Sequence, residues 1–297
     1  MAKIIECVPN ISEGRRPEVV EQIVDTLRAR PDVKLLDYSS DADHNRTVVT
    51  VVGEPQAVKE AMVDFVGKAL ELIDLRYHQG QHPRMGAVDV IPFIPIKEVS
   101  VEEAVQLSKE LAETLYQKYQ IPSFLYESSA SADHRKNLAN LRKGEFEGMK
   151  DKVRTKEFTP DYGDDVHESF GITAIGARPF LVAFNINLAT DNLEVANQVA
   201  RAVRHLSGGL RYVKAMGVRL DDRGIVQVSM NLTDFTKTPI YRVFELVKLE
   251  AARYGVEIVG SEVIGMVPMA ALVNTANWYL RTEDFNIEQV LESRLME

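Results

Sequence analysis

The chain has 297 residues, of which 45% are hydrophobic, and its formal net charge is -9 with a pI near 5.3. An acidic chain has no overall attraction to nucleic acid or to an anionic membrane. Its apolar runs fall well short of the roughly 20 residues of a membrane span, and the first residues resemble no signal peptide. A single cysteine, Cys7, excludes an internal disulfide and a multi-cysteine metal site. We therefore expect a cytoplasmic protein that binds neither nucleic acid nor membranes.

The spacing of apolar residues predicts two successive series of strands and helices. In the first series we expect strands at residues 3–8, 33–38, 46–52, 87–94 and 123–126, and helices at 16–30, 56–73, 101–119 and 132–142. In the second series we expect strands at 180–188, 211–220, 225–232 and 256–263, and helices at 193–205, 239–254, 268–277 and 287–295. Residues 39–45 are polar and predict a loop. Residues 145–167 are charged and poor in aliphatics, which predicts an irregular connection or a lid.

Each series reads β-α-β-β-α-β, and the boundary between them falls near Arg178. The predicted fold class is therefore α/β of the α+β kind, with subdomains at residues 1–178 and 179–297. A split βαβ unit has helices on one face of its sheet only, so its other face needs a cover. We expect two mixed sheets packed face to face with helices outside, and a small-molecule site between the two subdomains.

The most informative segment is the loop that precedes the strand expected at residues 87–94. His78 and His82 are four residues apart there, but Gly80 and Pro83 disfavour a regular helix through them. The histidines should therefore not form a helical zinc pair. Histidine can accept a proton near neutral pH, and the neighbouring Arg84 supplies a fixed cation. The pattern favours His82 as an acid-base group that acts on an anionic substrate, although a structural histidine is the alternative.

Arginines near this loop could grip a substrate carboxylate through paired hydrogen bonds. Arg84 is one candidate, but an ion pair, for instance with Asp89, would explain it equally well. Arg46, at the start of a strand, competes for the same role, and the adjacent Asn45 is a further candidate for binding substrate or folate.

His44 follows Asp41 and Asp43, which resembles a weak metal site. A turn with side-chain caps explains this cluster better, so we expect no metal.

Several segments, in order along nearly the whole chain, resemble the glutamate formimidoyltransferase family. They are ECVPNISEG at residues 6–14, NRT at 45–47, HPRMGAVDVIPFIP at 82–95, GARPFLVAFNINL at 176–188, QVSMNL at 227–232, VGS at 259–261 and GMVP at 265–268. The resemblance implies two α/β subdomains with stacked sheets and a homodimer. It also implies transfer of a formimino group from N-formimino-L-glutamate to N5 of tetrahydrofolate, a step of histidine degradation that releases glutamate.

The resemblance also implies roles for particular residues. His82 matches the family's catalytic base, and two stretches match its folate-contacting segments. The first, residues 163–171, contains Gly163, His167 and Gly171, and the second, residues 208–217, contains Gly208 and Gly217. Tetrahydrofolate would be a co-substrate, and no metal is implied. Animal members carry an aspartate near the base where this chain has Ser39, so Asp41 or Asp43 would have to supply that carboxylate.

Two other functions use the same residues. A formyltransferase that takes the formyl group of 5-formyltetrahydrofolate to glutamate would need the same base and folate pocket. A non-catalytic folate-binding protein would keep the glycine stretches but would not need the base, so an intact HPRMG string argues against it. A metal hydrolase is the interpretation that the histidines alone would suggest.

Overall fold

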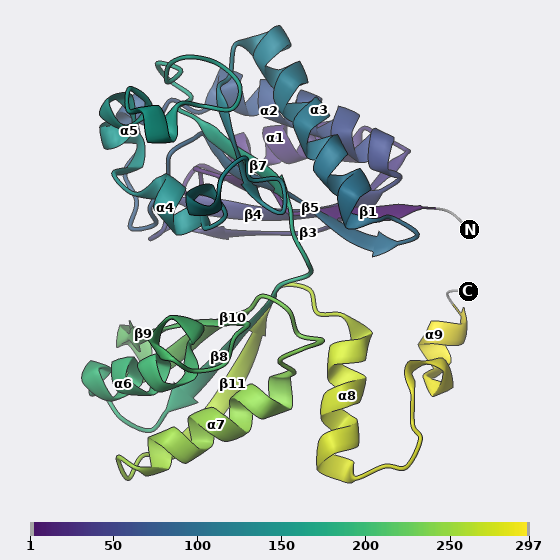
Figure 1. The fold of residues 1–297 in the computed structure, drawn as a ribbon, viewed down its shortest axis with the longest axis vertical. Helices are drawn as coiled ribbons and strands as arrows, with labels where there is room; N and C mark the ends of the chain where they lie inside the picture. Colours follow the sequence, from purple (N-terminus) through teal and green to yellow (C-terminus); the bar gives the residue numbers. More distant parts are fainter. Residues whose placement is uncertain (1–2, 296–297) are drawn as a thin grey trace. The chain divides into compact units, whose positions relative to one another are not determined.

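The computed structural model describes residues 3–295 and divides into two compact units after Arg178 (Figure 1). The strands of the first unit are β1 (Ile4–Cys7), β2 (Asn10–Ile11), β3 (Val33–Asp41), β4 (Arg46–Gly53), β5 (Val88–Lys97), β6 (Ser123–Glu127) and β7 (Thr173–Ala177). Its helices are α1 (Pro17–Arg28), α2 (Pro55–Leu72), α3 (Val101–Tyr119), α4 (Leu138–Arg142) and α5 (Glu145–Val153). The second unit has strands β8 (Val182–Leu188), β9 (Val213–Leu220), β10 (Ile225–Leu232) and β11 (Ile258–Ile264), with helices α6 (Leu193–Val203), α7 (Ile240–Ala252), α8 (Met269–Leu280) and α9 (Leu291–Leu295).

The first unit is built on a mixed sheet. Strands β1 and β2 lie one after the other between β4 and β5, β3 pairs with β4, and all these pairings are antiparallel. On the far side of β5, strands β7 and β6 add in parallel. The sheet therefore contains a split βαβ unit and a parallel extension.

Residues of the central strands alternate between two cores in the first unit. Ile91 and Phe93 pack with α1, α2 and α3 on one face, whereas Val90 faces the opposite core. That second core receives Met149 and Val153 from α5 and Leu141 from α4. Helices α1–α3 thus cover one face and α4 and α5 cover part of the other, as Figure 1 shows. If the pairing of a strand slipped by one residue, its side chains would exchange faces, so this alternation fixes the register.

Local signals explain where the main helices of this unit begin. Pro17 stands in the first turn of α1, and the Glu13 carboxylate accepts hydrogen bonds from the backbone N–H groups of Arg15 and Arg16. Helix α3 starts with a capping box between Ser100 and Glu103. The capping box satisfies N–H groups of α3 that have no partner within the helix, whereas α1 has no side-chain cap and its start is favoured by Pro17.

The second unit has the strand order β11-β8-β10-β9, and every pairing is antiparallel. We expected a mixed sheet here, and that detail was wrong. In a split βαβ unit the two parallel strands joined through a helix are separated by an antiparallel strand, so no parallel pair forms. Phe184, Ile186 and Leu188 of β8 pack against α6 and α7. The two-subdomain α+β fold class is confirmed, and face-to-face packing of the two sheets stays a prediction.

The structure corrects several element predictions in the first unit. Residues 145–167 are not wholly irregular, because α5 forms at their start and buries Met149 and Val153, which are one turn apart. The helix expected at residues 132–142 is a 3₁₀ turn at Asp133–Arg135 followed by α4. Strand β3 continues to Asp41, into the expected polar loop.

Strands β2 and β7 were missed. Strand β7 is buried on both faces, so it lacks the polar-apolar alternation on which the prediction depended. In the second unit, the last predicted helix, residues 287–295, is also interrupted: it consists of a 3₁₀ turn at Ile287–Gln289 and then α9. Within residues 3–295, no helix is both long and apolar enough to cross a membrane.

Candidate active site

Two loops of the first unit are tied together and carry the candidate residues. The loop before β4 approaches the loop before β5 so closely that a Cβ on Gly80 would lie 2.3 Å from the His44 carbonyl oxygen. The Gln81 N–H donates to the Asp43 carbonyl at 3.1 Å. Gly80 is therefore required by backbone contact, since any side chain would separate the loops. No helix runs through His78 and His82, as expected.

Asn45 joins three segments of this framework. It adopts a left-handed backbone conformation with φ 49°, and its Oδ1 accepts a hydrogen bond from the Gly14 N–H at 2.9 Å. Its Nδ2 donates to the Gln79 carbonyl at 2.9 Å. The amide that the sequence suggested for substrate binding is thus occupied by the protein's own backbone. Asn45 holds the two loops against the segment before α1.

His78 and Arg84 form the other side of the same network. The His78 Nε2 lies 3.0 Å from the Asn45 carbonyl, and the Arg84 Nε donates to the His78 Nδ1 at 3.0 Å. These two contacts require the neutral imidazole with its proton on Nε2. Burial lowers the pKa of His78, in agreement with a neutral ring.

Arg84 is buried and its guanidinium is engaged by carboxylates of α5. Its Nη1 contacts Glu145 and Glu147 at 2.8 Å each, and its Nη2 contacts Glu147 at 2.6 Å. Asp89, the partner that the sequence suggested, is paired with Arg142 instead and accepts a hydrogen bond from the Met85 N–H. Arg84 thereby connects the loop of His82 to the start of α5.

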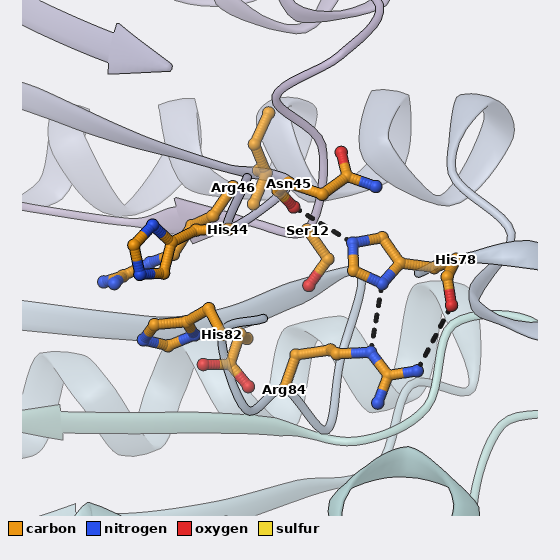
Figure 2. A pocket seen from close by; sticks show the side chains of 9 residues that line it. Ser12, His44, Asn45, Arg46, His78, His82 and Arg84 are labelled. Carbon is orange, nitrogen blue, oxygen red and sulfur yellow. Dashed lines mark hydrogen bonds between the residues drawn. The ribbon is translucent and has the colours of Figure 1, made fainter. Parts of the chain in front are cut away.

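His82 lies at one end of a small pocket with His44 and Arg46, while His78 and Arg84 lie at the other end (Figure 2). The rings of His44 and His82 meet edge to face with centroids 6.2 Å apart. The Asp41 carboxylate contacts the His44 Nδ1 at 2.9 Å and accepts from the His44 N–H at 2.8 Å. Asp41 therefore supports His44 and reaches His82 only through that second imidazole.

Burial and the charges around His82 keep its imidazole neutral. Burial, reinforced by the charges of Arg46 and Arg142, lowers the pKa of His82 to about 3. From the sequence we expected an ordinary imidazole pKa; burial is the main reason for the lower value, and the charges of Arg46 and Arg142 add to it. A neutral imidazole has a free lone pair at physiological pH and can accept a proton.

Arg46 and Arg142 bring positive charge to the pocket without full compensation. The Nε atoms of both side chains are buried and have no hydrogen-bond partner within residues 3–295. Burial and the charge of Arg142 lower the pKa of Arg46 to about 10. Buried polar groups of proteins are nearly always hydrogen-bonded, so two unsatisfied guanidinium atoms beside one imidazole require an explanation.

The first glycine stretch runs beside the His82 loop. Gly171 has φ +83°, and a Cβ on it would lie 2.1 Å from the Met85 carbonyl oxygen, so only glycine allows this approach. His167 exchanges backbone hydrogen bonds with Gly171, and its Nδ1 accepts from the Phe170 N–H at 3.1 Å. Gly163, with φ +88°, packs against Pro122 and Tyr116. Of the three, Gly171 is the one that contacts the base's own loop.

The second glycine stretch belongs to the second unit. Gly208, with φ +96°, ends a 3₁₀ turn in open space. Gly217 lies in β9, where its N–H donates to the Asn197 side chain at 3.3 Å. The structure thus places the candidate residues in two groups, one in each unit.

An open pocket of about 400 Å³ adjoins the small pocket. Ser12, Asn45 and His78 line both spaces, and Arg15, Arg16 and Tyr77 are among the other residues of the larger one. The Ser12 hydroxyl donates to the Gly86 carbonyl at 2.8 Å, which fixes the boundary between the two pockets. This volume adjoins the small pocket at its His78 end and provides room for part of a substrate there.

Sequence reasoning missed Arg142 and Ser12 as neighbours of His82; it named Asp41 as a carboxylate near the base but missed that His44 lies between the two. Arg142 is 60 residues from His82, and no local pattern indicates that α4 meets this loop. Ser12 lies within the ECVPNISEG string, so that string was a signal that could have been used. Among residues 3–295, no group of three or more His, Cys, Asp or Glu side chains is arranged to hold a metal ion.

Comparison with known proteins identifies the class to which this fold and pocket belong. Residues 4–178 match the N-terminal subdomain of the formiminotransferase domain, and residues 183–296 match the formiminotransferase domain. The chain therefore belongs to the formiminotransferase family.

Two of the similar proteins match this chain along almost the whole length of both proteins. The chain is 51% identical to a glutamate formimidoyltransferase of Streptococcus pyogenes over 100% of both proteins. It is 42% identical to a glutamate formimidoyltransferase of Thermoplasma acidophilum, over 98% of this chain and 97% of that protein. It is also 38% identical to a formimidoyltransferase-cyclodeaminase of Rattus norvegicus, where the match covers 100% of this chain and 56% of the longer protein.

Proposed function

We propose that this protein is a glutamate formimidoyltransferase. It transfers the formimino group of N-formimino-L-glutamate to N5 of tetrahydrofolate and releases glutamate. The family match along both units supports this activity, with tetrahydrofolate as co-substrate. The observation that carries the mechanism is a half-buried, neutral His82 in a pocket lined by Arg46, with the charge of Arg142 also acting on the imidazole.

The transfer requires one proton to move between two nitrogens. N5 of tetrahydrofolate attacks the amidine carbon and loses its proton to the neutral His82 imidazole as the new C–N bond forms. The resulting imidazolium then donates that proton to the glutamate nitrogen as the old C–N bond breaks. The positive charges of Arg46 and Arg142 disfavour the imidazolium, so they promote the second proton transfer. No net proton is gained or lost by the protein.

Folate contacts are proposed for both glycine stretches. In the first unit, residues 163–171 adjoin the His82 loop through the contact of Gly171 with Met85. In the second unit, the second stretch, residues 208–217, begins at Gly208 and ends at Gly217. Asn45 acts as a framework residue in this proposal, because its amide groups hold the two loops. A homodimeric state, a cytoplasmic location and the absence of a metal stay predictions of the sequence.

The formyltransferase is the second candidate, since it differs only at the donor carbon. A product assay separates the two. Purified protein receives tetrahydrofolate with N-formimino-L-glutamate in one reaction, and glutamate with 5-formyltetrahydrofolate in another. We expect 5-formiminotetrahydrofolate and free glutamate in the first reaction at a much higher rate than N-formylglutamate in the second. Formation of N-formylglutamate alone would replace the proposed activity.

A further inference from the structure

The strongest unexplained feature is the pair of guanidinium groups beside His82. Arg46 comes from the start of β4 and Arg142 from the end of α4, 96 residues apart in the chain. Each has a buried Nε atom that finds no hydrogen-bond partner among residues 3–295. Leaving such donors unpaired costs free energy, about 1–3 kcal/mol for a buried polar group and more for a charged one. Arg46 lines the pocket of His82, and Arg142 contacts Asp89, which lines it too, so the two unpaired donors indicate a missing acceptor at this place.

The protein's own carboxylates do not supply that acceptor. Asp89 is buried and contacts Nη2 of Arg142, and its other oxygen accepts from the Met85 N–H. Asp41 is held by His44. Two cations therefore face one committed carboxylate, and the two arginines repel each other, as the lowered pKa of Arg46 reflects. A carboxylate from outside would satisfy both Nε donors and remove the excess charge.

The position of the pair beside the base decides which carboxylate fits. In N-formimino-L-glutamate, the nitrogen that must receive the proton is bonded to the carbon that carries the α-carboxylate. When that nitrogen is at His82, its α-carboxylate is necessarily close by. The glutamate tail of tetrahydrofolate is separated from N5 by the pteridine ring system and the aminobenzoyl group, so it extends away from the base.

We infer that Arg46 and Arg142 form the binding site for the α-carboxylate of the formimino donor, next to His82. This inference rests on the proposed function, and it assigns donor specificity to Arg142, a residue outside the segments that carry the family resemblance. The chemical class of the ligand is an α-amino acid whose nitrogen is formimidoylated. An arginine pair suits a carboxylate, because guanidinium groups present parallel N–H donors.

The same arrangement makes the base depend on the donor. The charged and titratable groups around the His82 imidazole are Arg46 of β4, Arg142 of α4, Asp89 of β5, and His44 with Asp41 in the loop before β4. With the pocket empty, the two arginines oppose protonation of the imidazole. A bound carboxylate neutralises them, so the imidazole becomes a stronger base when the donor is in place.

The test compares wild-type protein with Arg142→Gln, using N-formimino-L-glutamate and its α-carboxamide. In the wild type we expect the α-carboxamide to have a KM about 10- to 100-fold higher, in line with the loss of a charge-assisted hydrogen bond. Arg142→Gln should raise KM for the natural donor by a similar factor and should abolish most of the discrimination between the two donors. Tetrahydrofolate affinity should change little. Arg154→Gln, which removes an exposed cation of similar size near the end of α5, is the matched control and should retain full discrimination.

Two further variants exclude a merely structural effect. Arg142→Gln leaves Asp89 without its ion-pair partner, so Arg142→Gln with Asp89→Asn restores a neutral pair and should still fail to discriminate. Arg142→Lys keeps the charge and should give an intermediate ratio of the two KM values. An active wild type whose discrimination survives in folded Arg142→Gln or in the double variant would overturn the inference and leave the proposed function intact. A wild type inactive with N-formimino-L-glutamate would instead refute the proposed function.

Discussion

At the residue scale, the neutral state of His82 depends on its cationic neighbours. Burial comes first and the charges of Arg46 and Arg142 follow, and together they lower the pKa of the imidazole to about 3. Arg46→Gln removes one of these charges, so we expect the pKa of His82 to rise toward that of a free histidine. An NMR titration of the histidine ring signals measures this directly. An unchanged titration in folded Arg46→Gln would show that the charge of Arg46 does not reach the imidazole; Arg154→Gln is the control.

Glu6 is a second buried group with a displaced pKa, and it affects stability. Its side chain is 4% exposed, and burial, opposed by Arg178, raises its pKa from 4.5 to about 7. Between these two pH values the folded state keeps a proton that the unfolded state has released. The contribution of Glu6 to the free energy of unfolding is fully present below pH 4.5. It is lost as pH rises through 7, because the folded protein must then bury a charged carboxylate.

We therefore expect Glu6→Gln to stabilise the protein at pH 8, by at most about 3 kcal/mol, and to have little benefit at pH 5. Urea unfolding at the two pH values tests this. Glu113→Gln, at a surface position of α3 that bonds Gln117, controls for the loss of one acidic group. Equal effects of Glu6→Gln at both pH values would contradict the linkage.

At the element scale, Arg84 determines how α5 meets the His82 loop. Lysine keeps the charge but cannot reproduce the paired contacts with Glu145 and Glu147 or the bond to His78. We expect Arg84→Lys to increase hydrogen exchange across residues 145–153 and to lower stability by about 1–3 kcal/mol. Arg154→Lys, at the residue that follows α5, is the control.

The opposite pattern would assign Arg84 to the substrate. If exchange in α5 stays at the wild-type level while the KM for the formimino donor rises, the guanidinium grips substrate carboxylate and its contacts with α5 are secondary. The experiment thus decides between the two roles that the sequence left open for Arg84.

Elements with strong periodicity could be predicted from the sequence, and those fixed by distant contacts could not. The prediction for α3 matches the observed bounds because a capping box begins it and Gln120, with φ 55°, ends it. By contrast, β7 is a buried parallel strand whose pairing with β5 and β6 depends on residues far along the chain. Helix α5 looked irregular because its stabilising partners, Arg84 and the core around Met149, are also distant in sequence.

The same distinction holds for the candidate site. His82 could be identified because Gly80, Pro83 and the HPRMG string surround it within a few residues. Arg142 could not, because α4 reaches the pocket through tertiary packing. Asn45 was assigned to substrate although its backbone partners, Gly14 and Gln79, lie in two other segments. The local sequence pattern therefore identifies the base, whereas the charged side chains around it can be located only in the folded chain.

At the scale of the whole molecule, both units should be needed for activity. The base and the first glycine stretch belong to residues 1–178, and the second glycine stretch belongs to residues 179–297. We expect each half, expressed separately, to lack formimino transfer even when circular dichroism shows that it is folded. The full chain purified in parallel provides the reference rate. Turnover by residues 1–178 alone would show that the second unit is dispensable for catalysis.

In the proposed reaction, His82 moves the proton between the two nitrogens. The most direct measurement is the turnover number of His82→Ala for N-formimino-L-glutamate and tetrahydrofolate, together with its folate dissociation constant. Positioned acid-base catalysis contributes roughly 10²- to 10⁴-fold, so turnover should fall by about that factor. The folate dissociation constant should stay near that of the wild type, since the loss is confined to proton transfer. A correctly folded His82→Ala protein with near-normal turnover would contradict the account.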